Sequence, residues 1–194
     1  MESFGGNDGN KDDGFTLTPM QRAERIRLFL AERDAPAAEE GDAQRKLSSD
    51  ATLAVIIMTD DMFRKRGDAG NPTWEHYAVT CGICACLTDA IIQFTNLPRE
   101  AMPAMLPDAI HFLFSGPERK DWPAPELTYT FALTQYKHMM GQPNLRDAVD
   151  KLGGQFYEYL AVGGDACLAA MQDQFNLLMA NPDLPVELKD VTDA

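Results

Sequence analysis

The feature that most constrains this chain is a long apolar stretch over residues 74–97. It carries one formal charge between Glu75 and Arg99, which is Asp89, and prolines lie close to both of its ends. Because proline suits a first helical turn and also follows helix ends, the pattern predicts one long helix. Apolar side chains cover most of its circumference, which is typical of a buried helix. One narrow polar stripe remains: Gly82, Cys86, Asp89, Gln93 and Asn96.

The other apolar segments also repeat at helical spacing. Residues 53–58 alone could form a short buried strand, but the length of the surrounding pattern favours a helix. Capping residues and prolines mark helices that start at Thr18, after Pro98 and over 50–66, 107–115, 125–140, 144–162 and 165–180. The predicted fold is all-α: a single bundle of about six to seven helices around a buried central helix, residues 74–97.

The 194 residues are enough for one domain with a sizeable core. Residues 1–16 are rich in Gly, Asn and Asp, which predicts a disordered tail. Residues 17–182 form the expected helical domain. Inside it, residues 35–48 combine turn formers and charges without an apolar period, which predicts a flexible linker. Residues 183–194 are expected to be a frayed acidic tail.

The chain is strongly acidic, with 30 Asp and Glu residues against 17 Lys and Arg residues and a formal net charge of −13. Such a chain repels nucleic acid and anionic membranes at long range, and it favours basic partners or no charged partner. Solubility alone also accounts for this charge. Residues 1–14 lack the layout of a secretory signal, and Asp89 and Gln93 would be costly in lipid. A cytoplasmic protein is expected.

Three of the four cysteines lie in the central stretch. Cys81 and Cys84 share one helix face, Cys86 lies on another, and Cys167 is distant in sequence. A CxxC pair can bind zinc or carry out dithiol chemistry. Zinc pairs normally sit in turns beside a second pair, and redox pairs sit at a helix start. The cysteines are therefore expected to pack as small hydrophobic residues, without a disulfide framework.

A metal site built from His76, Cys81, Asp108 and His111 is an alternative. Asp108 and His111 have the spacing that ligand pairs use in carboxylate-bridged di-iron bundles. Those bundles need two Glu-x-x-His motifs and two further glutamates, which this chain lacks. Isolated histidines are more often simply hydrogen-bonded. The favoured prediction is therefore no metal and no cofactor.

No hydrolase, phosphate-loop or zinc-protease motif is present in the sequence. The pair Gly153–Gly154 either kinks a helix or lets a neighbour approach closely, and Gly163–Gly164 ends a helix. The basic run Arg64–Arg66 is short for a nucleic-acid patch, and cations at a helix C-terminus before Gly67 are the simpler interpretation. A DNA-binding regulator is kept as a second alternative, although no recognition-helix pattern is found.

Large amphipathic and methionine side chains near predicted helix starts and loops are candidates for contacts with a partner, although they also suit the edge of a core. They are Trp74, Tyr77, Met102, Met105, Trp122 and Tyr129. The leading hypothesis is a non-enzymatic acidic protein-binding factor: an adaptor, a regulator, or an inhibitor that occupies a basic nucleic-acid-binding surface of its partner. The first alternative is a helical metal- or small-ligand-binding protein or enzyme with a site in a central pocket.

Overall fold

The computed structural model describes residues 40–67, 76–114 and 124–181. This part of the chain forms six α-helices and one short 3-10 helix, and it contains no strand. The prediction of an all-α bundle is confirmed. The elements are α2 (Glu40–Arg66), α3 (Tyr77–Thr95), η2 (Arg99–Ala101), α4 (Met102–Phe114), α5 (Pro125–Gly141), α6 (Pro143–Val162) and α7 (Asp165–Met179).

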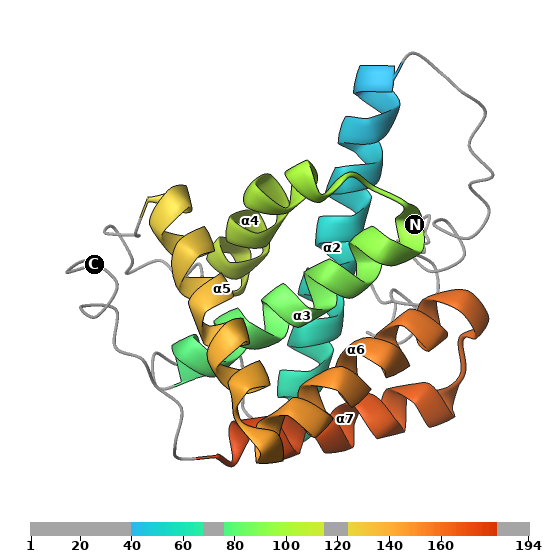
Figure 1. Cartoon of the computed structure of the whole chain (residues 1–194). Coiled ribbons are helices and arrows are strands. Elements are labelled where there is room, and N and C mark those ends of the chain that lie inside the picture. The colour runs from blue at the N-terminus through green and yellow to red at the C-terminus, as the bar shows by residue number, and fades with distance from the viewer. Residues whose placement is uncertain (1–39, 68–75, 115–123, 182–194) are drawn as a thin grey trace, which may run out of the picture.

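The central helix of the bundle is α3, which packs against all five other described α-helices. Figure 1 shows α3 crossing the middle of the molecule, with α4 on one side, the α6–α7 pair on the other, and α5 passing across it. Almost every residue of α3 up to Ile92 is buried. The helix ends at Asn96, whose left-handed conformation (φ 53°) is one that asparagine tolerates. The prediction of a buried central helix is confirmed, with slightly shorter bounds.

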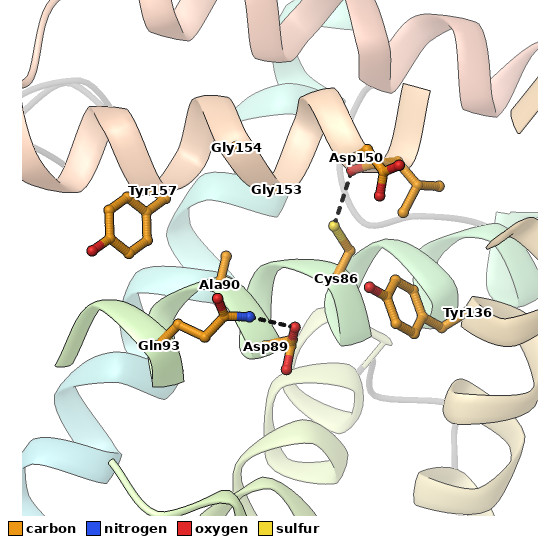
Figure 2. Close-up of a pocket in the computed structure, with 10 residues that line it drawn as sticks. Cys86, Asp89, Ala90, Gln93, Tyr136, Asp150, Gly153, Gly154 and Tyr157 are labelled. Atoms are coloured by element: carbon orange, nitrogen blue, oxygen red, sulfur yellow. Dashed lines mark hydrogen bonds between the residues drawn. The ribbon is translucent and has the colours of Figure 1, made fainter. Parts of the chain in front are cut away.

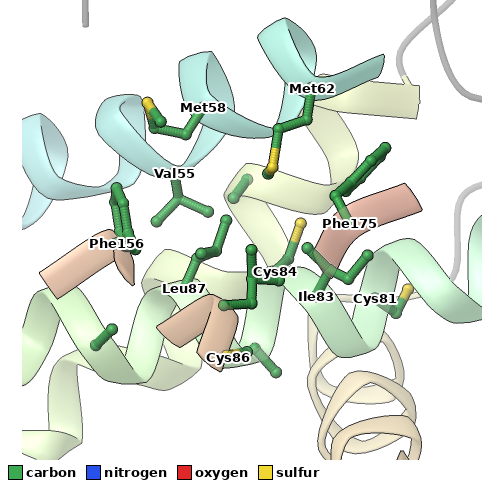
Figure 3. Close-up of a cluster of buried hydrophobic side chains, with 14 of the residues drawn as sticks. Val55, Met58, Met62, Cys81, Ile83, Cys84, Cys86, Leu87, Phe156 and Phe175 are labelled. Atoms are coloured by element: carbon green, nitrogen blue, oxygen red, sulfur yellow. The ribbon is translucent and has the colours of Figure 1, made fainter. Parts of the chain in front are cut away.

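The core between α2 and α3 is closed by side chains from four helices. Figure 3 shows Val55 and Met62 of α2 facing Ile83 and Leu87 of α3, with Phe156 of α6 at one side. All of these side chains are almost completely buried. Burying one such side chain stabilises the fold by about 1.5–3 kcal/mol. The apolar surface of α3 is thus the common contact surface of the bundle.

Helix α3 is also the one described helix that is long and apolar enough to cross a membrane by length and composition. However, 78% of that stretch is buried inside the bundle. The core helix of a bundle meets the same two criteria, because burial in protein and burial in lipid both select apolar residues.

The prediction of a flexible linker over 35–48 is wrong for residues 40–48, which form the first turns of α2. None of residues 41–50 is buried, so this part of the helix has no apolar face and no apolar periodicity. The absence of that periodicity led to the prediction of a linker. Good helix formers fill residues 43–47, and the Arg45 guanidinium pairs with the Asp42 carboxylate at 2.6 Å. In Figure 1 these turns extend beyond the neighbouring helices. Residues 35–39 lie outside the described residues.

The prediction of separate helices after Pro98 and from Pro107 is also corrected. The segment forms η2 and then one helix, α4, with Pro107 inside it. A proline inside a helix removes one backbone hydrogen bond and disfavours the fold. Here the flanking side chains of Leu106 and Ile110 are completely buried, and their burial offsets that loss.

Two glycines permit close contacts of α3 with its neighbours. A Cβ atom at Gly82 would overlap Sδ of Met139 on α5, and a Cβ atom at Gly153 of α6 would lie 3.1 Å from Sγ of Cys86. Helix α6 runs unbroken through Gly153, so the glycine pair serves a close approach and does not end the helix. A Cβ atom at Gly154, by contrast, would meet nothing within 4 Å.

We expect the same substitution to have opposite effects at two glycines. Gly82→Leu should lower the free energy of unfolding by about 2 kcal/mol or more, because the added side chain overfills the α3–α5 contact. Gly154→Leu should leave it unchanged or raise it by up to about 1 kcal/mol, because leucine favours helix and the site is open. Urea unfolding followed by circular dichroism measures both, and equal effects at the two positions would contradict this account.

Candidate functional site

An open hollow of about 400 Å³ lies where α3, α5 and α6 meet. We call it the α3–α6 hollow, and Figure 2 shows it in close-up. Its polar and aromatic walls come from Cys86, Asp89 and Gln93 of α3, Tyr136 of α5, and Asp150 and Tyr157 of α6. Ala90, Val149, Gly153 and Gly154 complete the lining.

The helical repeat explains why these residues meet. Cys86, Asp89 and Gln93 lie on one face of α3, which is the polar stripe of the central helix. Asp150, the glycine pair and Tyr157 likewise lie on one face of α6. The two faces oppose each other, and no side chain projects from the glycine pair to fill the space between them.

A hydrogen bond joins the α3 and α6 walls of the hollow. The thiol of Cys86 donates a hydrogen bond to the backbone carbonyl of Val149, with 3.4 Å between sulfur and oxygen. Gly153 lies at the same level and leaves room for the sulfur atom. This contact holds α6 against α3 and sets the depth of the hollow.

The lining of the hollow carries two carboxylates and no lysine, arginine or histidine. Asp89 accepts a hydrogen bond from the Gln93 amide at 2.7 Å, and Arg99 approaches it to 4.0 Å. Asp150 lies 3.7 Å from the Arg146 guanidinium. Exposed ion pairs of this kind contribute about 0–1 kcal/mol, so both carboxylates keep most of their capacity for another cation.

The Tyr136 hydroxyl and the Cys86 thiol that line the hollow keep their protons at neutral pH. Burial, with a smaller contribution from the charges of Asp89 and Asp150, raises the pKa of the Tyr136 hydroxyl to about 12. Burial and the same two carboxylates raise the pKa of the Cys86 thiol to about 12. A thiolate or phenolate is therefore disfavoured at neutral pH, and the charge of the hollow comes from its two aspartates.

Two tyrosine rings flank the carboxylates. In Figure 2, Tyr157 and Tyr136 lie at opposite ends of the hollow, with Asp89 and Asp150 between them. Phe94 contacts Tyr157 edge-on, with ring centroids 5.5 Å apart, while 45% of Tyr157 stays exposed. The phenylalanine thus orients a ring that remains available to a ligand.

A second, smaller hollow of about 330 Å³ adjoins the first and shares Asp150 with it. It adds Asp147, whose carboxylate pairs with Lys151 at 2.6 Å. Asp147, Asp150, Gly154 and Tyr157 follow one another along one face of α6. That face offers a strip roughly 15 Å long, from the rise of 1.5 Å per helical residue.

Of the predicted partner-binding residues, the four that the structure describes do not line either hollow. Tyr77 and Met105 are buried, with exposed fractions of 3% and 2%, so the prediction of surface contacts is wrong for both. The Tyr77 ring packs between the rings of Phe114 and Phe131, as a core residue. Met102 and Tyr129 are partly buried and pack against the core. Trp74 and Trp122 lie outside the described residues.

The alternative metal set is not assembled. No three His, Cys, Asp or Glu side chains within the described ranges are close enough to hold an ion. His111 shares a hydrogen bond of 3.0 Å with the Thr128 hydroxyl, and burial lowers its pKa. His76 lies against the Phe63 ring, Cys81 is completely buried, and Asp108 is exposed.

The basic run at the end of α2 is matched by aspartates one turn earlier. Arg64 pairs with Asp60 and Lys65 pairs with Asp61, each at 2.7 Å. These pairs join residues four apart on one helix, which is a common way to stabilise a helix surface. They support the interpretation of this run as a helix end.

The chain matches no protein-family model, and no curated protein or solved structure is significantly similar to it.

The α3–α6 hollow is not predicted by the sequence, although the patterns that form its two walls are each present there. The polar stripe of α3 and the glycine pair of α6 are each visible in the sequence. Their pairing is not visible, because the Cys86–Val149 contact joins positions 63 residues apart. A polar line on an otherwise apolar helix, together with a glycine pair inside another helix, is the signal that could have indicated the site.

We expect the stability of the protein to fall as the pH rises from about 9 to about 12. Thiols of the unfolded chain lose their protons near pH 9, whereas those of Cys84 and Cys86 keep them up to about pH 12 in the fold. The unfolded chain then binds fewer protons than the folded chain, so the free energy of unfolding decreases with pH. Urea unfolding across this range should show a smaller decrease for Cys84→Ala than for the wild type, and identical decreases would contradict the account.

Proposed function

We propose that this protein is a cytoplasmic, non-enzymatic protein-binding factor, an adaptor, regulator or inhibitor whose partner presents a basic surface. The observation that carries the proposal is the α3–α6 hollow, which has two carboxylates and two tyrosines in its lining and no basic side chain. Tyrosine is enriched in protein interfaces, and charge complementarity steers and orients partners.

The openness of the hollow supports binding of a macromolecule. Gln93, Asp150, Gly154 and Tyr157 are all exposed. Pockets for small ligands usually enclose 70–90% of the ligand and are mostly apolar. An open, polar hollow encloses little of a free small molecule, but it suits a side chain that a larger partner holds in place.

The chemistry of the hollow also supports binding over catalysis. A nucleophile or general base requires a group whose pKa lies near the working pH. The Cys86 thiol and the Tyr136 hydroxyl have pKa values raised to about 12, so neither is activated at neutral pH. The groups that remain charged are aspartates, which accept hydrogen bonds and balance a cation.

The surrounding surface has the same sign of charge as the hollow. The α6–α7 pair carries more acidic than basic residues: Asp147, Asp150, Glu158, Asp165 and Asp173 against Arg146 and Lys151. The whole chain has a formal net charge of −13. A surface of one sign accelerates association with a surface of the opposite sign. A nucleic-acid-binding surface is one such basic partner, and occupying it would make this protein an inhibitor.

The two alternatives lack a comparable supporting contact in the described residues. The candidate ligands His76, Cys81, Asp108 and His111 are not gathered around one point. The basic run of α2 is paired with Asp60 and Asp61 on the same helix. For these reasons the protein-binding proposal is preferred over a metal-binding protein and over a DNA-binding regulator.

A pull-down of the tagged full-length chain from its host, analysed by mass spectrometry, tests the proposal. We expect a stoichiometric protein partner at about 0.1 M salt, and substantial loss of that partner at about 1 M salt, where the screening length falls from about 10 Å to about 3 Å. Asp150→Lys should also reduce recovery of the partner. Asp173→Lys makes the same charge change on α7, outside both hollows, and should leave recovery unchanged. Absence of any partner would contradict the proposal, and retention at high salt would contradict a basic partner surface.

A further inference from the structure

We infer that the α3–α6 hollow binds an arginine side chain of the partner protein, with the guanidinium group between Asp89 and Asp150. This inference rests on the proposed function, because it identifies the chemistry that the partner brings to the hollow. Three features of the described residues carry it: the placement of the carboxylates, the flanking rings, and an exposed glycine.

The carboxylates stand on opposite walls. Asp89 belongs to α3 and Asp150 belongs to α6, and both line the same hollow (Figure 2). A guanidinium group has five N–H donors in one plane, so it can donate toward two walls at once. A lysine ammonium group is a compact and strongly hydrated point charge, which suits a single acceptor. Carboxylates on two walls therefore favour arginine.

The rings provide faces for a planar cation. Tyr136 and Tyr157 flank the carboxylates, and Phe94 orients the Tyr157 ring by an edge-on contact. Guanidinium groups stack on aromatic faces, and the attraction is larger where water is excluded. An arginine whose head lies between the aspartates can pass its aliphatic stem along one of these rings.

Gly154 is an independent indication of a ligand. It lies inside α6, where glycine disfavours the helix relative to alanine. Packing does not require a glycine there, because a Cβ atom would meet nothing within 4 Å. Gly153 differs, since Cys86 occupies the space beside it. The missing side chain at Gly154 is thus unnecessary for the fold, but it keeps the hollow open next to Tyr157.

The chain's own arginines leave both aspartates available to a partner. Arg99 reaches Asp89 at 4.0 Å and Arg146 reaches Asp150 at 3.7 Å, both near the limit for an ion pair. Both arginine side chains are largely exposed, at 81% and 65%. Contacts this long and this exposed are weak, so a partner arginine can displace them at little cost. Neither Arg99 nor Arg146 lines the hollow.

The test is an NMR titration of the full-length chain with three short peptides. The probes are Ac-Gly-Gly-Arg-Gly-Gly-NH₂ and its lysine and citrulline counterparts, since citrulline keeps the shape of arginine without its charge. We expect the arginine peptide to shift the backbone amides of Asp89, Gln93, Gly154 and Tyr157, and to bind more tightly than the lysine peptide. The citrulline peptide should produce no saturable shift. Equal binding of the three peptides would overturn the inference.

Matched variants separate the hollow from the general acidic surface. Asp89→Asn and Asp150→Asn should each weaken arginine-peptide binding by about fivefold or more, since each removes the negative charge that strengthens a hydrogen bond from the guanidinium group. Asp173→Asn removes the same charge from α7 and should leave the affinity unchanged. Gly154→Leu should block peptide binding without altering any charge. A thermal unfolding measurement of this variant checks that it is folded. Undiminished binding to Gly154→Leu would overturn the inference.

The two proposals fail in different ways. If the partner is captured equally well by the wild type, Asp150→Asn and Gly154→Leu, the protein-binding function stands and the arginine site is wrong. If no partner is captured while the arginine peptide binds in the hollow and is blocked by Gly154→Leu, the arginine site stands and the protein-binding function is wrong.

Discussion

The burial of the apolar surface of α3 is the constraint on which this structure depends. An apolar helix of this kind is stable in water only when neighbours cover its apolar side chains, and five helices do so. Side-chain size limits how close they come. Gly82 admits Met139 of α5, and Cys86 fits beside Gly153 of α6. Small residues at these two points therefore decide where α5 and α6 lie against the central helix.

The candidate site follows from the same packing. Cys86 makes a hydrogen bond between its walls, and beyond it the polar stripe of α3 continues to Asp89 and Gln93. These side chains need water or a polar partner, because burying a carboxylate against apolar side chains is strongly unfavourable. The bundle leaves this line uncovered, and Gly154 keeps the space above it free. Stability and the proposed recognition thus use adjacent residues of one helix face.

The three cysteines of α3 illustrate how environment decides chemistry. Cys81, Cys84 and Cys86 are all free and buried, and burial raises each of their thiol pKa values. The neutral thiol is a small, polarisable group that fills space and donates a weak hydrogen bond. Two of them carry the spacing of a CxxC pair, yet they lie inside a buried helix where the thiolate is disfavoured. The sequence-based expectation of packing agrees with this burial.

The sequence by itself determined the all-α class, the buried central helix and most helix starts, because apolar periodicity and proline act locally. It did not determine that residues 40–48 are helical, since exposed turns carry no apolar period. It also could not distinguish core from surface for Tyr77 and Met105, because the same amphipathic side chain suits both. The α3–α6 hollow was decided only by tertiary structure. Its walls are distant in sequence, and only the packing of α6 on α3 brings the two carboxylates to one space.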